Sequence, residues 1–244
     1  MNIYFIDTLE LTYSSDFDDI IKLTKNFKMV DPKKGAGNKE FISTELSGMG
    51  IIIKTRRSSK AELYKNSNKY KLVLRINPNK FYKPYMKTEH ISNIIEFCDM
   101  VERLDMQIQY CFSGLTIDDF EITRVDLTED IHGIPEDKIT QYIRIMRQLY
   151  LTLGFHHNKK LEENTEDFDP DSSFNAVNDS KKVEFVVYNK GHEVRSKKNS
   201  SDEQKEHYKD TMRVEVRCRK KFADKLSEKA YTAQKLVEIY RRRM

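Results

Sequence analysis

The chain has 244 residues, 38% hydrophobic and 34% charged, which suits one large or two small folded domains and excludes a disordered chain. Its 43 Lys and Arg nearly balance 39 Asp and Glu, so any affinity for a polyanion must come from local basic blocks. Three unpaired cysteines and the lack of a long apolar run exclude a disulfide framework, a zinc cluster and a membrane span. A reduced, cytoplasmic setting is expected.

The first half of the chain predicts strands followed by a helix. Residues 3–13 alternate apolar and polar side chains, which is typical of a strand, and the acidic residues that follow suit the start of a helix. Residues 50–55, 60–65 and 69–77 are expected to be further strands. After Pro84, apolar residues recur at helical spacing: Ile91, Ile94, Ile95, Cys98, Val101 and Leu104.

The second half repeats this order. Residues 120–131 predict a strand, and a helix with an apolar face follows Pro135. Two strands follow at 183–194 and 211–222, and an apolar periodicity that ends at Tyr240 predicts a final helix. Each half therefore gives a strand, a helix, two strands and a helix.

This order predicts an α+β fold made of two ferredoxin-like (RRM-like) halves, with antiparallel sheets backed by helices. The expected domains are residues 1–115 for DNA binding and residues 116–244 for the chemical site. Residues 156–180 are polar and acidic and lack periodicity, so they are expected to form a flexible insertion.

Three strands of the second half carry the residues that suggest chemistry. Side chains two positions apart share a face of a strand, so Arg124 and Asp126 lie on one face of theirs. In the same way Tyr188 shares a face with Glu184 and Lys190. The last strand places four charged residues on one face: Arg213, Glu215, Arg217 and Arg219. If the three strands are adjacent, Asp126, Tyr188 and Glu215 converge on one surface.

These residue types suit the cleavage of a phosphodiester by a protein nucleophile. The Tyr188 phenol, with an ordinary pKa of about 10, needs a metal or a cation to become a good nucleophile. Asp126 and Glu215 are hard oxygen ligands of the kind that Mg²⁺ or Mn²⁺ prefers. Lys190 and the arginines of the last strand are expected to neutralise phosphate oxygens.

Each residue also has a plain structural interpretation. A tyrosine on a strand is most often a packing residue, and Arg124 with Glu215 is also consistent with a cross-strand ion pair. His192 and Glu193 follow the tyrosine closely enough for a role in proton transfer or ligand binding. The sequence contains no Walker loop, GxGxxG or HExxH motif.

The three strands resemble motifs of a known group, the rolling-circle replication initiators of filamentous phages (gene II protein type) and of the Rep_trans plasmids. Members of that group show R-[IV]-D, Y-N-K-x-x-E and R-[FVI]-E-x-R strands in this order. Here these motifs are residues 124–126, 188–193 and 213–217. The resemblance covers about residues 50–225.

The resemblance implies an HUH-endonuclease-like fold and a site-specific nickase that initiates rolling-circle replication of a phage or plasmid. Tyr188 would be the nucleophile that stays joined to the 5′ phosphate, Asp126 and Glu215 the metal ligands, and Glu193 the acid after the tyrosine. The His-hydrophobic-His motif of related nickases is absent, so Mg²⁺ or Mn²⁺ would be held largely by carboxylates.

The implied partners are single-stranded or cruciform origin DNA, a host helicase and a host polymerase, and a homodimer is left open. The expected catalytic residues are Tyr188, Lys190 and Glu193. The expected DNA-binding residues are Arg56, Arg57, Arg75, Arg124, Arg213, Arg217 and Arg219. The alternative is a non-catalytic module that binds a single strand by stacking and charge, with Tyr64, Tyr70 and Arg75.

Overall fold

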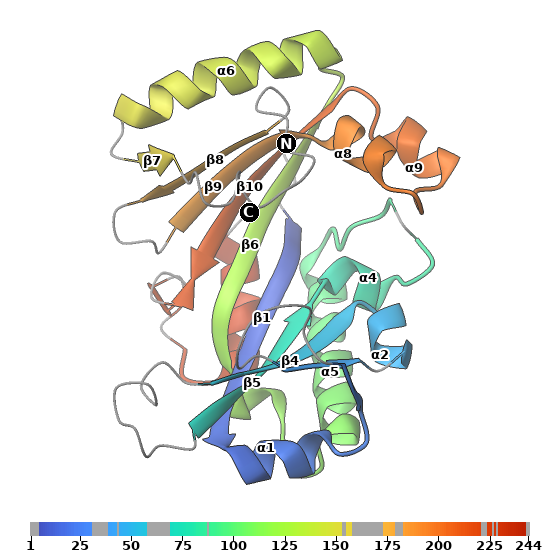
Figure 1. The fold of residues 1–244 in the computed structure, drawn as a ribbon, viewed down its shortest axis with the longest axis vertical. Coiled ribbons are helices and arrows are strands. Elements are labelled where there is room, and N and C mark those ends of the chain that lie inside the picture. Colours follow the sequence, from blue (N-terminus) through green and yellow to red (C-terminus); the bar gives the residue numbers. More distant parts are fainter. Residues whose placement is uncertain are drawn as a thin grey trace. The chain divides into compact units, whose positions relative to one another are not determined.

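The computed structural model shows an α+β protein whose antiparallel sheet strands are backed by helices (Figure 1). The structure describes residues 5–30, 39–42, 44–57, 69–86, 88–152, 155–157, 173–178, 183–220, 224–225, 227 and 229–242. The expected α+β class is therefore confirmed. The strand expected at 60–65, which includes Tyr64, lies outside the described residues.

The chain forms two compact units, and each contains two separate stretches of sequence. Unit 1 comprises residues 1–5 and 126–222, and unit 2 comprises residues 6–125 and 223–244. A single boundary near residue 115 was expected. The observed units instead divide after residue 125 and again after residue 222, and residues 1–5 belong to unit 1. The final helix was expected in the C-terminal half, but it belongs to unit 2 with the N-terminal strands.

Unit 2 contains most of the N-terminal elements. Its strands are β1 (Phe5–Asp16), β2 (Lys28–Val30), β3 (Lys39–Ile42), β4 (Ile51–Arg57), β5 (Lys69–Ile76) and the first part of β6 (Glu121–His132). They stand in the order β2-β3-β4-β5-β1-β6. Its helices are α1 (Phe17–Thr24), α2 (Thr44–Gly48), α4 (Pro78–Tyr82), α5 (Ile94–Cys111), the short 3₁₀ helix η1 (Ile117–Asp119) and α11 (Thr232–Arg242).

Two helices far apart in the sequence pack together in unit 2. Helix α5 begins where the Asn93 side chain accepts a hydrogen bond from the Glu96 backbone N–H, which satisfies one of the free donors of the first turn. Phe97 of α5 stacks on Tyr240 of α11 with ring centroids 4.2 Å apart. The Tyr240 hydroxyl also donates a hydrogen bond to the Ile91 carbonyl oxygen at 3.1 Å. These contacts fix α11 in unit 2.

Unit 1 contains the second part of β6 and the strands β7 to β10. These strands stand in the sheet in the order β6-β10-β9-β8-β7. Its elements are α6 (Glu136–Thr152), β7 (Phe155–His157), β8 (Ser173–Asn178), β9 (Val183–Asn189), α8 (Lys190–Ser196), α9 (Asp202–His207) and β10 (Thr211–Arg219). Strands β7 and β8 lie inside the stretch 156–180, or at its border, where a flexible insertion without strands was expected. That expectation was wrong for residues 173–178.

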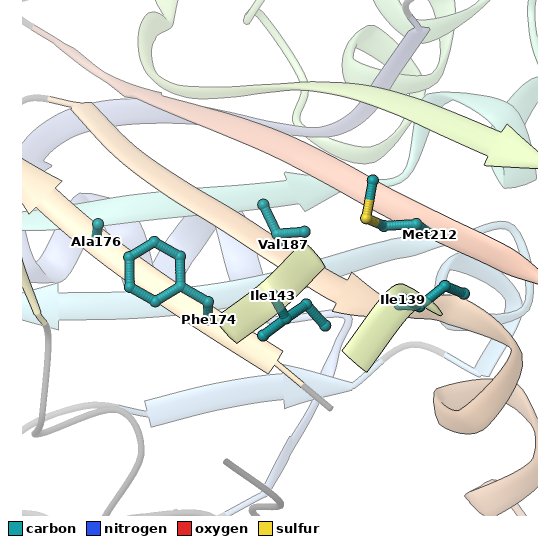
Figure 2. Close-up of a cluster of buried hydrophobic side chains, with 6 residues drawn as sticks. All are labelled: Ile139, Ile143, Phe174, Ala176, Val187 and Met212. Carbon is teal, nitrogen blue, oxygen red and sulfur yellow. The ribbon is translucent and has the colours of Figure 1, made fainter. Parts of the chain in front are cut away.

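Helix α6 covers the apolar face of the unit 1 strands. It starts directly after Pro135 with two acidic residues in its first turn, as the sequence predicts. Figure 2 shows the cluster beneath it, in which α6 meets β8, β9 and β10. The buried members are Ile139, Ile143, Phe174, Ala176, Val187 and Met212. Since this face is apolar, the opposite face of the same strands is the one that can carry chemistry.

Ile143 offers a direct measure of this packing because it is fully buried in the cluster of Figure 2. Replacing Ile143 by Val removes one methylene group, and we expect a loss of about 0.5–1.5 kcal/mol of unfolding free energy. Urea denaturation followed by circular dichroism measures it. The matched control is Ile145→Val on the same helix, where the side chain is half exposed and the loss should be close to zero. Equal losses in both variants would contradict this packing.

No helix within the described part of the chain has the length and apolar character needed to cross a membrane.

Candidate functional site

The register of β9 and β10 places the candidate residues on one face of the unit 1 strands. Tyr188 lies directly opposite Arg213, and Glu184 lies opposite Arg217. Directly opposite residues in an antiparallel pair share a face, so Glu215, between the two arginines, shares it too. Val187 and Met212 point to the other face, into the cluster beneath α6. The strand faces predicted for Tyr188, Glu184, Arg213, Glu215 and Arg217 are confirmed. The strand expected to run on to residue 194 ends at Asn189, so Lys190 lies in α8 and not on the strand face.

Tyr188 and Glu215 are joined directly. The Tyr188 hydroxyl donates a hydrogen bond to Glu215 Oε1 at 2.8 Å. The second carboxylate oxygen of Glu215 accepts hydrogen bonds from Nε and Nη2 of Arg217 at 3.2 and 3.0 Å. Because Arg217 holds one oxygen of the carboxylate, the other stays directed at the phenol. The ion pair of Glu215 and Arg217 thus fixes the orientation of the Tyr188 hydroxyl.

Arg217 lies among three carboxylates. Its Nε is 3.9 Å from Asp126 Oδ2, and its Nη1 is 3.6 Å from Glu184 Oε1. Asp126, Glu184 and Glu215 are all less than 5% exposed. Asp126 and Glu215 therefore lie on the same side of the sheet, as the hypothesis of a shared site requires. Arg217 lies between these three carboxylates in the structure, and its expected contact with a phosphate stays a prediction.

Glu184 and Asn175 were not among the predicted site residues. Asn175 of β8 donates a hydrogen bond to Glu184 Oε1 at 2.7 Å, and Arg219 lies 3.4 Å from Glu184 Oε2. A buried carboxylate held by an amide and two arginines has a fixed orientation. The only signal in the sequence was that Glu184 shares a face of its strand with Tyr188, which could not reveal these partners.

Lys190 and Glu193 form a pair at the start of α8. Lys190 Nζ donates to Glu193 Oε2 at 2.7 Å and lies 5.8 Å from the centre of the Tyr188 ring. Burial, and next the charge of Arg213, lower the pKa of Lys190, and Glu193 opposes both. For Glu193, burial raises the pKa, but the nearby ammonium groups of Lys190 and Lys197 outweigh it and the pKa is lowered. A cation thus lies next to the aromatic ring of the candidate nucleophile.

Arg213 has a different place from the expected one. Its guanidinium makes two hydrogen bonds to Asp130, at 2.6 and 2.7 Å, and both side chains are about 5% exposed or less. A buried bidentate ion pair is a structural contact, and its donors are turned toward Asp130. The expected contact of Arg213 with a phosphate is not what this geometry favours.

The other predicted DNA-binding arginines are spread over both units. In unit 1, Arg219 is about half exposed. In unit 2, Arg56 is also about half exposed and lies 3.8 Å from Glu10, while Arg75 is partly buried and Arg124 is only 8% exposed. The side chain of Arg57, at the end of β4, lies outside the described residues. Of the described predicted arginines, Arg56 and Arg219 are the most exposed.

The thiol of Cys218 is not a second candidate nucleophile. Cys218 of β10 is fully buried, and burial, with the charge of Asp126 adding to it, raises its pKa to about 12. Only the thiolate is a strong nucleophile, so this thiol is unreactive at neutral pH. Tyr188 is accordingly the candidate nucleophile that the geometry supports.

The donor chemistry of the site suits a hard divalent cation. Among the residues that the structure describes, no group of three or more His, Cys, Asp or Glu side chains forms a metal site. Mg²⁺, however, is usually bound by one or two carboxylates together with water and substrate phosphate oxygens. Asp126 and Glu215, which both reach the guanidinium of Arg217, can supply the two carboxylates. The residues present therefore fit such a cation.

The fold and the site define an α+β protein with a tyrosine, buried carboxylates and cations on one face of antiparallel strands and a helix on the other face. The family model Phage_CRI, which describes the N-terminal part of a phage replication-associated protein, matches residues 6–238. The chain belongs to this family. The resemblance to rolling-circle replication initiators is thereby confirmed, and a protein of this class binds origin DNA.

A solved structure is also similar. It is that of a rolling circle replication initiator protein from Geobacillus stearothermophilus, with a TM-score of 0.44 and 11% sequence identity, covering 98% of this chain and 80% of that one. No curated protein matches the chain.

Proposed function

We propose that the protein is a site-specific DNA nickase that initiates rolling-circle replication of a phage or plasmid through a covalent 5′-phosphotyrosine intermediate. The observation that carries the proposal is the hydrogen bond between the Tyr188 hydroxyl and Glu215, with Arg217, Asp126 and Lys190 around it. Membership of the phage replication-associated family supports the replication role.

In the proposed reaction, the Tyr188 oxygen attacks the scissile phosphorus in line with the bond to the 3′ oxygen. That bond breaks, the 5′ phosphate stays on Tyr188, and the 3′ oxygen takes a proton from solvent and leaves as a hydroxyl. The Tyr188 hydroxyl, which donates a hydrogen bond to Glu215 Oε1 before the attack, gives its proton to that carboxylate as the bond to phosphorus forms. This contact fixes the direction of the nucleophile, which reduces the entropy lost on reaching the transition state.

The cations have separate tasks in this proposal. Lys190 lies close to the Tyr188 ring, so its ammonium stabilises negative charge that develops on the phenol oxygen or the phosphate. Arg219 would hold the DNA backbone, and its exposure of about one half supports this role. Mg²⁺ or Mn²⁺, held by Asp126 and Glu215, would act as a Lewis acid on the phosphate when bound.

The test is adduct formation. The protein is incubated with 5′- or 3′-labelled single-stranded origin DNA and Mn²⁺, and a band that resists denaturation and carries the strand on the 5′-phosphate side is expected. Peptide mass spectrometry should place the nucleotide on Tyr188. Salt-sensitive DNA binding with no cleavage at any metal concentration would instead favour the non-catalytic single-strand-binding module.

A metal prediction follows from the carboxylates. Asp126→Asn removes a charged ligand, so the Mn²⁺ concentration for half-maximal cleavage should rise by about tenfold or more. Calorimetric titration of Mn²⁺ in the absence of DNA should show the same weakening. The matched control is Asp202→Asn on α9, whose side chain is almost fully exposed. Unchanged Mn²⁺ binding by Asp126→Asn would show that the metal is held elsewhere.

A further inference from the structure

Tyr208, immediately after α9, was not among the predicted site residues, yet it contacts two cations of the candidate site. It is 4% exposed. Its ring centre lies 5.3 Å from Lys190 Nζ and 5.7 Å from the central guanidinium carbon of Arg213. A ring that faces two buried cations attracts both through its negative face. Tyr208 thus lies where its ring can hold Lys190.

The backbone at Gly191 brings Tyr208 this close. A Cβ atom at Gly191 would lie only 2.7 Å from the Tyr208 carbonyl oxygen, which is shorter than any ordinary contact. Glycine is therefore required for α8 to pack against the end of α9. Asn189 caps the same turn by accepting the backbone N–H of His192 at 2.8 Å. Together these contacts fix the first turn of α8, which carries Lys190.

We propose that Tyr208 is a positioning residue, which together with the close backbone contact at Gly191 holds the Lys190 ammonium group beside the Tyr188 ring. This inference rests on the proposed function, since it assigns a support to a residue of that site. The Tyr208 ring lies 5.3 Å from Lys190 Nζ, and Glu193 accepts a hydrogen bond from the same Nζ at 2.7 Å. Lys190 thereby keeps one place next to the nucleophile in the absence of DNA.

The charged groups around Lys190 determine the expected pH behaviour. Glu193 of α8, Lys197 directly after α8 and Arg213 of β10 are the charged groups around it. The rings of Tyr188, on β9, and Tyr208, directly after α9, also lie near it. Burial is the largest cause of its lowered pKa. The charged form is thus lost at a lower pH than in an ordinary lysine. Cleavage should therefore fall as pH rises through this lowered pKa.

The experiment compares Tyr208→Ala with the conservative variant Tyr208→Phe. Without the ring, Lys190 loses its support and water reaches it, so adduct formation should fall on the order of ten- to a hundredfold. Loss of the ring exposes Lys190 to water, which raises its pKa, and it also removes a contact that favours the charged form, which lowers it. The first effect is the larger, so the alkaline limb of the pH profile should move to higher pH. Tyr208→Phe keeps the ring and should retain both the rate and the limb.

A second measurement does not depend on cleavage. Competitive labelling of the DNA-free protein with acetic anhydride, read by mass spectrometry across pH, reports the reactivity and pKa of Lys190. Tyr208→Ala should raise the pKa of Lys190 and, at pH values above that pKa, should also raise the labelling rate of the free amine, because the group is more accessible. Gly191→Ala, which pushes α8 away from Tyr208, should do the same. Circular dichroism melting identifies any variant that does not fold, and Tyr208→Phe then decides the result.

Two outcomes would overturn the proposal: labelling of Lys190 that is the same in Tyr208→Ala and the unmodified protein, or a loss in Tyr208→Phe as large as in Tyr208→Ala. If the unmodified protein forms no adduct with DNA, the proposed nickase fails. The labelling results still decide whether Tyr208 positions Lys190.

Discussion

Replacing Tyr188 by Phe should abolish the covalent protein–DNA adduct while DNA binding stays within about twofold of the unmodified protein. The change removes only the hydroxyl that donates to Glu215 Oε1, and the ring keeps its place near Lys190. The reaction then has no nucleophile in position, and removal of a catalytic nucleophile commonly costs on the order of 10⁴- to 10⁶-fold in rate. Adduct formation is measured on denaturing gels and binding by fluorescence anisotropy at fixed salt.

The matched control for this prediction is Tyr142→Phe. Tyr142 lies in the same unit, on α6, and its side chain is half exposed. The Tyr142→Phe variant should keep the full rate of adduct formation. A Tyr188→Phe protein that still cleaves origin DNA at the normal rate would show that another group attacks the phosphate. Loss of DNA binding together with cleavage would mean that the hydroxyl holds the strand.

How far the sequence predicts this site depends on which interactions are local. The side-chain period of a strand is set by its own backbone, so the shared face of Arg213, Glu215 and Arg217 could be predicted. The register between strands is set by distant residues. The pairing of Glu184 with Arg217 therefore appears only in the structure. Asn175 lies on a strand that the polar composition of its region concealed.

Burial is the second property that alternation does not determine. The polar face of a strand is expected to be exposed to solvent. Arg213 lies on such a face, so it was expected to be accessible to a DNA phosphate. In the structure Tyr208 and Phe5 lie against its guanidinium, with ring centres 5.7 and 5.3 Å away. Phe5 comes from the other end of the chain, so no local pattern around Arg213 could indicate it. For the same reason, the packing of α11 on α5 could not be predicted from local patterns, because it depends on Phe97 and Tyr240, which are far apart in the sequence.

The buried pair of Arg213 and Asp130 supports the second large prediction, which concerns stability. Replacing Arg213 by Met should lower the free energy of unfolding by about 3–5 kcal/mol, because it leaves the Asp130 carboxylate buried without its bidentate partner. Urea denaturation followed by circular dichroism measures the loss. The double variant Arg213→Met with Asp130→Leu should recover much of it, since an apolar pair of similar volume costs no charge desolvation.

The control for Arg213 is Arg219→Met on the same strand and the same face. Arg219 is about half exposed, 3.4 Å from Glu184, and an exposed ion pair contributes only about 0–1 kcal/mol. The two variants should therefore fail in different assays. Arg213→Met should lower the stability of the protein, whereas Arg219→Met should weaken DNA binding and reduce its salt dependence. If Arg213→Met instead leaves unfolding unchanged and weakens DNA binding, Arg213 contacts phosphate as the sequence pattern predicts. The ion pair would then open when DNA binds.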